Sequence, residues 1–420
     1  MTPKITYLDN GFRIVSENWQ RLETVSVGIW VDAGSRHEPA SLNGIAHFIE
    51  HMLFKGTEKR SAQQIAEEIE EVGGHLNAYT SRDQTTYYAR VLKEDVALAV
   101  DIIGDIIVHS RFDEAETTRE RDVILQEIGQ AEDTPDDIIF DHLQACIYGD
   151  QALSRPILGS QDTVRAITAK ALRQHRDETY CPSNMILAAV GNVDHDALVV
   201  MAEKIFGALP VRSSQKITTA QYIGGMTHQD RPLEQLHITL GFLGVSLHDD
   251  GYYAMQVFST LLGGGMSSRL FQEVREKRGL AYSIYSFTSS HDETGFWGIY
   301  AGTSAEMANE LLGVVADVCK DVLETLSEAE VLRAKTQLKA GLMMAMESTT
   351  TRVEQLARQL MVFDRLVPTQ EVLDGIDAVD GAAIKALLMK SLTEAPMSMA
   401  YVGPKGGMPS SKEVAAKFKL

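Results

Sequence analysis

Two histidines and a glutamate, His47, Glu50 and His51, are the residues in this sequence whose types and spacing could do chemistry. Positions four apart lie one above the other on an α-helix, so both imidazoles can reach one metal ion while Glu50 stays beside it. A catalytic zinc ion takes about three protein ligands and keeps a fourth position for water. The spacing therefore predicts a zinc-bound water with a base next to it. A third ligand must come from elsewhere in the chain.

The order of these residues, H-x-x-E-H, is the inverted form of the metalloprotease motif H-E-x-x-H. The alternative interpretation is a pair of surface histidines on an amphipathic helix. An internal comparison within the chain separates the two interpretations.

The second half of the chain repeats the first at an offset near 210 residues. Residues 235–242 resemble 25–30, 251–262 resemble the histidine helix, and 401–403 match 189–191. Such a period is too long for a solenoid and predicts a duplicated α+β domain. We predict an N-terminal catalytic domain at 1–209, a linker at 210–230, and a C-terminal domain without metal ligands at 231–420.

The second copy keeps the helix and loses the candidate ligands. At an offset of 208, the three positions of the motif fall on Met255, Phe258 and Ser259. If the fold itself required histidines, both copies would carry them. The loss therefore favours a functional role for the first copy's residues.

Two glutamates on a later helical pattern, Glu120 and Glu127, are the candidates for the third ligand. They lie seven residues apart on a stripe shared with apolar residues, where a carboxylate costs free energy unless it is paired or bound to a metal. In the second half, at an offset of 214, the same positions hold Ala334 and Gly341. Both acids are thus lost where the histidines are lost. Spacing alone leaves open which glutamate contacts the metal.

The elements that must position these residues can be read from turn and capping signals. Asn10-Gly11 predicts a hairpin, Ser61 with Gln64 a capping box at a helix start, and Gly73-Gly74 the end of that helix. Strands are expected at 25–31, 75–80 and 86–91, and helices at about 94–109 and 114–132.

Composition describes an ordinary globular chain with an acidic balance. Of 420 residues, 44% are hydrophobic and 23% charged, and the net charge is −19. Such a field repels nucleic acid and suits a basic peptide. We find no apolar run long enough to span a membrane and no signal peptide at the N-terminus, and three widely spaced cysteines suit a reducing compartment. We therefore expect no nucleic-acid or membrane partner.

The chain resembles the inverted-zincin, or pitrilysin-type, metallopeptidase family, most closely the catalytic beta subunit of the mitochondrial processing peptidase and its bacterial relatives. The segments 73–80 and 155–159 add to the motif, and the similarity covers essentially the whole chain. In this family a glutamate about 76 positions after the second histidine is the third ligand, which Glu127 matches. The resemblance implies that Glu120 orients a ligand. It also implies two similar domains, each a largely antiparallel sheet covered by helices, that form a clamshell around a chamber.

The resemblance also implies an activity: zinc-dependent endopeptidase cleavage of extended, presequence-like or other short and possibly basic peptides. One Zn²⁺ per chain would be held by His47, His51 and Glu127, and Glu50 would move the proton as the zinc-bound water attacks. In the second half, Arg275 and Tyr282 are similar to the pair with which the family grips substrate near the scissile carbonyl. From the residues alone, a charged helical surface is the favoured interpretation of Arg275, and the resemblance reverses that preference.

Further expectations concern substrate, partners and location. Asn77 and Ala78, on a strand beside the motif, are candidates for pairing with an extended peptide. We expect a homodimer or a heterodimer with a glycine-rich non-catalytic paralogue, in the bacterial cytoplasm.

Two other functions compete with peptide cleavage. One is a non-catalytic structural or regulatory subunit of the same fold, against which the intact ligand set argues. The other is metal-assisted hydrolysis of a phosphoester, which the lack of a second ligand cluster disfavours.

Overall fold

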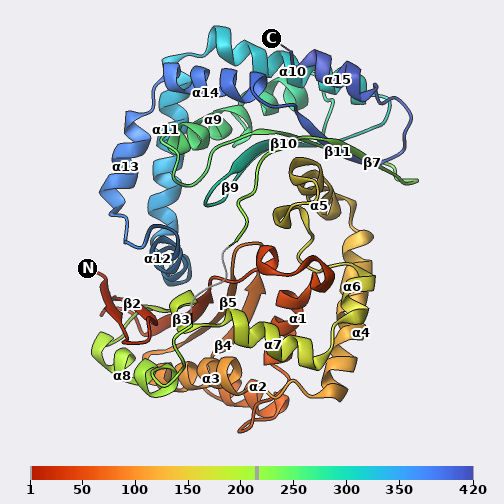
Figure 1. Cartoon of the computed structure of the whole chain (residues 1–420). Helices are drawn as coiled ribbons and strands as arrows, with labels where there is room; N and C mark the ends of the chain where they lie inside the picture. The colour runs from red at the N-terminus through yellow and green to blue at the C-terminus, as the bar shows by residue number, and fades with distance from the viewer. Residues whose placement is uncertain (1, 213–216, 420) are drawn as a thin grey trace. The chain divides into compact units, whose positions relative to one another are not determined.

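The computed structural model describes residues 2–212 and 217–419, which divide into two compact units. Unit 1 comprises residues 1–129, 155–218 and 344–367, and unit 2 comprises 130–154, 219–343 and 368–420. Each unit is a β-sheet with helices on its faces (Figure 1). The predicted α+β class is confirmed. Residues 213–216, within the predicted linker, lie outside the described residues.

The sheet of unit 1 has six strands in the order β1-β2-β6-β3-β5-β4. The strands are β1 Lys4–Tyr7, β2 Arg13–Asn18, β3 Thr24–Val31, β4 His75–Thr80, β5 Thr85–Leu92 and β6 Met185–Gly191. β2 and β6 run parallel, whereas the other neighbours are antiparallel. The predicted hairpin at Asn10-Gly11 is present, and Gly11 takes a φ of 89° that favours glycine.

The helices of unit 1 include the predicted motif helix and the helix of the candidate third ligands. They are α1 Ile45–Leu53, α2 Ala62–Glu71, α3 Val96–His109, α4 Glu114–Glu132, α6 Gln161–Ala166, α7 Ala169–Thr179, α8 His195–Phe206 and α12 Thr349–Phe363. The boundary of unit 1 falls near the end of α4, after Gly129, so both candidate glutamates lie in unit 1. Ser61 and Gln64 form the predicted capping box of α2. Short 3-10 turns link elements of unit 1 at Ser35–His37, Ala40–Leu42, Lys93–Asp95 and Pro182–Asn184, and a further one, Ala152–Ser154, lies in unit 2.

The sheet of unit 2 repeats the arrangement of unit 1 without the first strand. Its order is β7-β11-β8-β10-β9, for β7 Met226–Asp230, β8 Leu236–Leu243, β9 Ser283–Ser290, β10 Gly295–Thr303 and β11 Ser398–Gly403. β7 pairs parallel with β11, as β2 does with β6, and the remaining pairs are antiparallel. Equal order and equal direction of five strands confirm the predicted duplication.

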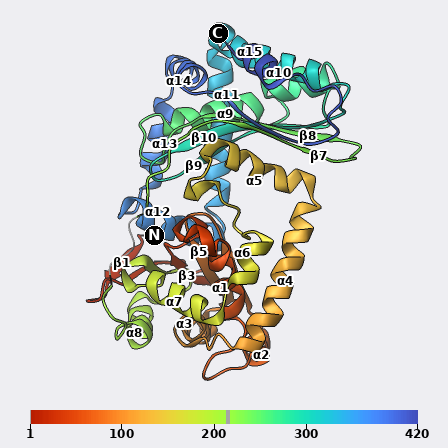
Figure 2. The same cartoon turned by 45° about the vertical axis from the view of Figure 1, so that its right-hand side comes forward.

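The helices of unit 2 lie on both faces of its sheet. They are α5 Pro135–Tyr148, α9 Tyr252–Gly263, α10 Ala308–Thr325, α11 Glu328–Ala345, α13 Thr369–Ala378, α14 Gly381–Thr393 and α15 Ser411–Lys417, with a π-helical turn at Phe271–Glu276. One face packs against α9, α10 and α14 and the other against α5, as Figure 2 shows for α9 and α5. The strands between the two layers are therefore apolar on both faces.

Each unit takes one helix from the other half of the sequence. α5 follows the helix of the candidate ligands in sequence but packs on unit 2, through Ile139, Leu143 and Ile147. α12 comes from the second half and covers the sheet of unit 1, where Arg352 pairs with the buried Glu17 at 2.6 Å. The predicted domain ranges, 1–209 and 231–420, are contiguous and do not include this exchange.

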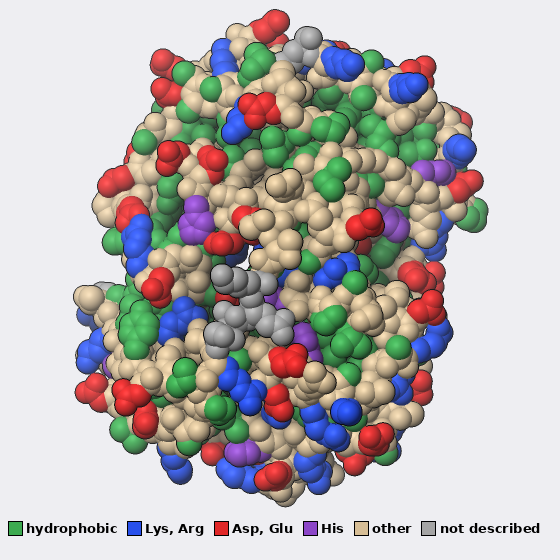
Figure 3. All heavy atoms as spheres, viewed as in Figure 1, with side chains coloured by type: hydrophobic (Ala, Val, Ile, Leu, Met, Phe, Trp, Pro, Cys, Tyr) green, Lys and Arg blue, Asp and Glu red, His purple; other side chains and the backbone are tan. Residues whose placement is uncertain are grey.

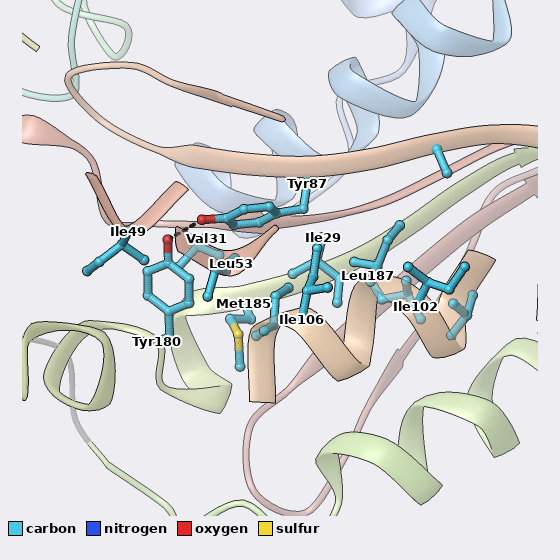
Figure 4. Close-up of a cluster of buried hydrophobic side chains, with 14 of the residues drawn as sticks. Ile29, Val31, Ile49, Leu53, Tyr87, Ile102, Ile106, Tyr180, Met185 and Leu187 are labelled. Carbon is cyan, nitrogen blue, oxygen red and sulfur yellow. Dashed lines mark hydrogen bonds between the residues drawn. The ribbon is translucent and has the colours of Figure 1, made fainter. Parts of the chain in front are cut away.

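The core of unit 1 holds the motif helix in place. Ile49 and Leu53 of α1 point into a cluster with Ile29 and Val31 of β3, which Figure 4 shows. All four side chains are fully buried. Burying an aliphatic side chain of this size contributes about 1.5–3 kcal/mol, so the position of α1 on the sheet is strongly fixed.

Two further features of the described residues are the distribution of surface charge and the hydropathy of the helices. Figure 3 shows acidic and basic side chains interspersed over the face it draws, so the charge of −19 does not collect there in one patch. Among the described residues, no helix is long and apolar enough to cross a membrane.

Candidate metal centre

The helix α1 presents its apolar face to the core and its two imidazoles to the opposite side. Phe48, Ile49 and Met52 are buried, whereas the side chains of His47 and His51 keep 12% and 18% exposure. The ring centroids of the two histidines are 4.6 Å apart. The i, i+4 geometry expected from the sequence is therefore present.

Glu127 of α4 lies next to both histidines. Its Oε2 is 3.7 Å from Nε2 of His47 and 3.6 Å from Nε2 of His51. These three residues form a group whose potential ligand atoms all lie within 4.8 Å of one another. Glu120, the other candidate, lies two turns earlier on the same stripe of α4 and contacts His51 through the other ring nitrogen.

These separations fit a bound zinc ion. Two ligands that are each about 2.1 Å from a tetrahedral ion lie about 3.4 Å apart, close to the two distances measured here. They are too long for good hydrogen bonds between the same groups. Burial, and to a smaller extent the neighbouring His51, lower the pKa of His47 to about 3. His47 is therefore a neutral imidazole, the form that binds metals.

Glu50 lies on the same helix, beside the candidate ligands. Its Oε2 accepts a hydrogen bond of 2.5 Å from the hydroxyl of Thr80, at the end of β4. Burial raises the pKa of Glu50, and the hydrogen bond from Thr80 opposes this shift. A carboxylate whose pKa is raised towards neutrality is a better proton acceptor and donor at neutral pH.

Glu120 joins His51 to a lysine. Its Oε2 is 3.1 Å from Nδ1 of His51, and its Oε1 is 2.6 Å from Nζ of Lys55. Since a carboxylate only accepts, this contact places the ring proton on Nδ1 and leaves Nε2 with a free lone pair. The lone pair faces Glu127, where a metal would lie. The expectation that Glu120 orients a ligand agrees with this geometry.

Glu38 caps the start of the motif helix. Its carboxylate oxygens accept from the backbone N–H groups of Gly44 and Ala46, at 2.9 and 2.8 Å, and from the side chain of Asn43. Gly44 has a φ of 97°, and a Cβ there would lie 2.6 Å from the carbonyl oxygen of Leu158. Burial raises the pKa of Glu38 to about 7, although its three donors favour the ionised form. The first turn of α1 is thus held by a buried acid from outside the helix.

The strand with the candidate substrate-binding residues is the last in its sheet. β4 pairs with β5 on one side, and Asn77 is exposed. The backbone N–H of Ala78 donates to the side-chain oxygen of Asn77 at 2.8 Å. This N–H therefore has a local acceptor in the side chain of Asn77. An added strand could replace the side-chain acceptor.

Arg275 and Tyr282 lie together in unit 2. The guanidinium carbon of Arg275 is 4.7 Å from the ring centroid of Tyr282 and 4.8 Å from that of Phe271. Tyr282 is 77% exposed. Arg275 belongs to a π-helical turn, a form often found at functional sites. The predicted pair is thus a stacked arginine and tyrosine with a free phenol.

Three neighbours of the motif were not identified from the sequence: Glu38, Lys55 and Thr80. Thr80 ends a predicted strand and Lys55 follows the motif helix, and the i, i+4 relation of Lys55 to His51 is a signal that could have found it. Glu38 gives no such signal, because it lies six residues before the glycine that begins the helix.

Family comparisons agree with both halves of the chain. Residues 13–161 match the family described as Insulinase (Peptidase family M16), and residues 166–338 match the Peptidase M16 inactive domain. An uncharacterized zinc protease of Bacillus subtilis is 36% identical over 96% of this chain and 98% of its own length. A probable mitochondrial-processing peptidase subunit beta of Arabidopsis thaliana is 38% identical over 97% of this chain and 79% of its own.

Solved structures agree with the fold. A crystal structure of a peptidase M16 inactive domain from Pseudomonas fluorescens has a TM-score of 0.90 at 23% identity, covering 97% of this chain and 100% of that one. A protease from Helicobacter pylori has a TM-score of 0.89 at 21% identity, covering 96% and 99%.

Proposed function

Because the chain belongs to the insulinase family of peptidases, family M16, and is a zinc metallopeptidase, we propose a more specific activity. We propose that it is an endopeptidase that cleaves extended peptides, with Glu50 as the general base. The observation that carries the proposal is the group formed by His47, His51 and Glu127, with Glu50 on the histidines' own helix. One rigid element then sets the geometry between the base and the ligands.

The donor set suits a catalytic zinc ion, with two imidazoles, one carboxylate and room for water. When bound there, zinc would make water a strong nucleophile near neutral pH and polarise the peptide carbonyl. Glu50 would take a proton from the attacking water and give it to the leaving amine. Its hydrogen bond to Thr80 supports this role, because it holds one carboxylate oxygen and leaves the other free.

An extended peptide is the substrate that the edge of unit 1 favours. A peptide strand beside β4 could use its carbonyl to accept the Ala78 N–H that Asn77 now satisfies. The charge of −19 favours basic peptides, including presequence-like ones, by long-range attraction. In this proposal the Arg275 and Tyr282 donors of unit 2 bind near the scissile carbonyl and stabilise its developing charge.

The cysteines and one relative support proposals about location and assembly. Cys146, Cys181 and Cys319 are free thiols, which supports a reducing compartment such as the bacterial cytoplasm. The relative from Arabidopsis is named as a subunit. We extend that to a dimer here, either of two identical chains or with a glycine-rich non-catalytic paralogue. Size-exclusion with light scattering on protein from its native source tests this assembly.

A non-catalytic subunit of the same fold is the competing function. The test is hydrolysis of a fluorogenic peptide with a basic segment, with zinc measured in the same sample. An endopeptidase contains about one zinc per chain, loses activity with a chelator and regains it with zinc. Zinc-replete, folded protein that cleaves no member of a basic peptide library favours the structural subunit.

A further inference from the structure

Lys55 makes a contact with the metal centre that the proposed function does not use. It follows Phe54, the C-cap of α1, and lies one turn after His51. Its Nζ lies 2.6 Å from Oε1 of Glu120, and the other oxygen of that carboxylate lies 3.1 Å from Nδ1 of His51. Both carboxylate oxygens of Glu120 are thus in contact with side chains of one short segment, His51 and Lys55.

The burial of the Lys55–Glu120 ion pair distinguishes it from a solvent-exposed surface pair. The Glu120 side chain is 8% exposed, and that of Lys55 is 31% exposed. A carboxylate so far from water needs compensation, and Lys55 is the cation in contact with it among the described residues. By contrast, Lys59 is 59% exposed and stands 3.7 Å from Asp101, as surface pairs commonly do.

The two contacts also fix the orientation of the Glu120 carboxylate. If the carboxylate of Glu120 rotated away from His51, it would also have to leave the ammonium of Lys55. The hydrogen bond from His51 Nδ1 determines which ring nitrogen carries the proton and how the ring is turned. By holding Glu120 in place, Lys55 therefore also fixes the orientation of the His51 ring, whose Nε2 faces Glu127.

We propose that Lys55 is a positioning residue of the metal centre, which raises zinc affinity by holding Glu120 against His51. This inference rests on the proposed zinc site. Lys55 touches neither metal nor substrate. Its effect should appear first in metal binding and only through that in turnover.

The test is zinc affinity of the full chain, measured by competition with a chromogenic chelator. Lys55→Met keeps much of the side chain's length and removes its charge. We expect a zinc dissociation constant about 10–100-fold above wild type, the usual effect of losing a partner that orients a ligand. Lys55→Arg should restore affinity to within about threefold, because it returns a cation that can bind the carboxylate. Lys59→Met is the matched control and should leave affinity unchanged.

A second background separates a positioning role from a general structural one. In Glu120→Gln, adding Lys55→Met should weaken zinc binding by less than about twofold, because the partner is already lost. An equal loss in both backgrounds overturns the proposal, as does wild-type affinity in folded Lys55→Met. Should Lys55→Met fail to fold, Lys55→Gln replaces it in the same cycle. Failure of the zinc site itself is a distinct result: Glu127→Ala then binds zinc as tightly as wild type.

Discussion

The hydroxyl of Thr80 donates a hydrogen bond of 2.5 Å to Oε2 of Glu50, and so joins the last strand of the unit 1 sheet to the base on α1. Thr80 also lies 3.5 Å from the hydroxyl of Thr85, which donates to the carbonyl of Ala33. The helix α1 therefore places the base beside the ligands, and the sheet fixes the orientation of its carboxylate.

Removing this hydroxyl should impair turnover more than binding. A hydrogen bond to a charged group contributes about 1.5–3 kcal/mol, so we expect Thr80→Val to lower kcat by about 10–100-fold. KM should change little, because Thr80 orients the base. Steady-state kinetics on a fluorogenic peptide measures both constants. Thr80→Ser keeps the hydroxyl and should retain most activity, and a valine variant as active as wild type contradicts the role.

Replacing the base should separate zinc binding from chemistry. Glu50→Gln keeps the size of the side chain and removes its ability to accept and deliver a proton. Because general acid–base catalysis contributes about 10²–10⁴-fold, kcat should fall by that factor. Zinc content, measured by atomic emission, should stay near one per chain. The exposed Glu58 supplies the control, since Glu58→Gln should leave both values unchanged. Turnover by Glu50→Gln at the wild-type rate would falsify the assignment.

How far the sequence predicted this site depends on how local each relation is. His47, Glu50 and His51 lie within about one and a half turns of one helix, so their geometry follows from the helical period alone. Glu127 comes from another helix, and spacing could not choose it over Glu120. The resemblance to a family made that choice, and the measured distances agree with it. Tertiary packing decides which residue of a distant helix reaches the metal site, and that packing cannot be read from one sequence.

The same reason explains what sequence reasoning missed in the fold. Individual strands, the capping box of α2 and the duplication followed from local patterns and from comparing the halves. The exchange of α5 and α12 between the units could not be predicted, because the apolar pattern of an amphipathic helix does not show which sheet it will pack against. Glu38 reaches α1 because the chain between them forms a 3-10 turn, Ala40–Leu42, after which the side chain of Asn43 donates to the carbonyl of Pro156 in the next loop.

The capping acid gives a prediction about stability. In Glu38→Gln an amide N–H₂ would face groups that donate, and at least one buried N–H would lose its acceptor. We expect the free energy of unfolding to fall by about 1–3 kcal/mol at pH 8, above the pKa of about 7 that burial gives this acid. Urea denaturation of the zinc-free protein measures the change. Glu71→Gln, at an exposed position, is the control, and equal stabilities of the two variants argue against the cap.

The pair in unit 2 should act on substrate and not on the metal. Tyr282→Phe keeps the ring stacked on Arg275 and removes only the hydroxyl. If the hydroxyl donates to the scissile carbonyl, kcat/KM should fall by about 10²–10³-fold, as for other donors of this type. Zinc content should not change. Lys277→Met alters the same charged segment at a 61% exposed side chain and should have no effect. A phenylalanine variant with wild-type kinetics indicates a structural stack.

A buried histidine should make unit 1 sensitive to acid. His175 of α7 is 5% exposed, and burial lowers its pKa from 6.5 to about 4. The folded protein therefore resists a proton that the unfolded chain accepts below pH 6.5. Stability from this residue is complete above pH 6.5 and is lost as pH falls towards 4, by about 3 kcal/mol in all. Denaturation of zinc-free protein at several pH values should show this slope, and His175→Gln should reduce it. His109→Gln, at an exposed site, should keep the wild-type slope; if it flattens the curve equally, the assignment to His175 is wrong.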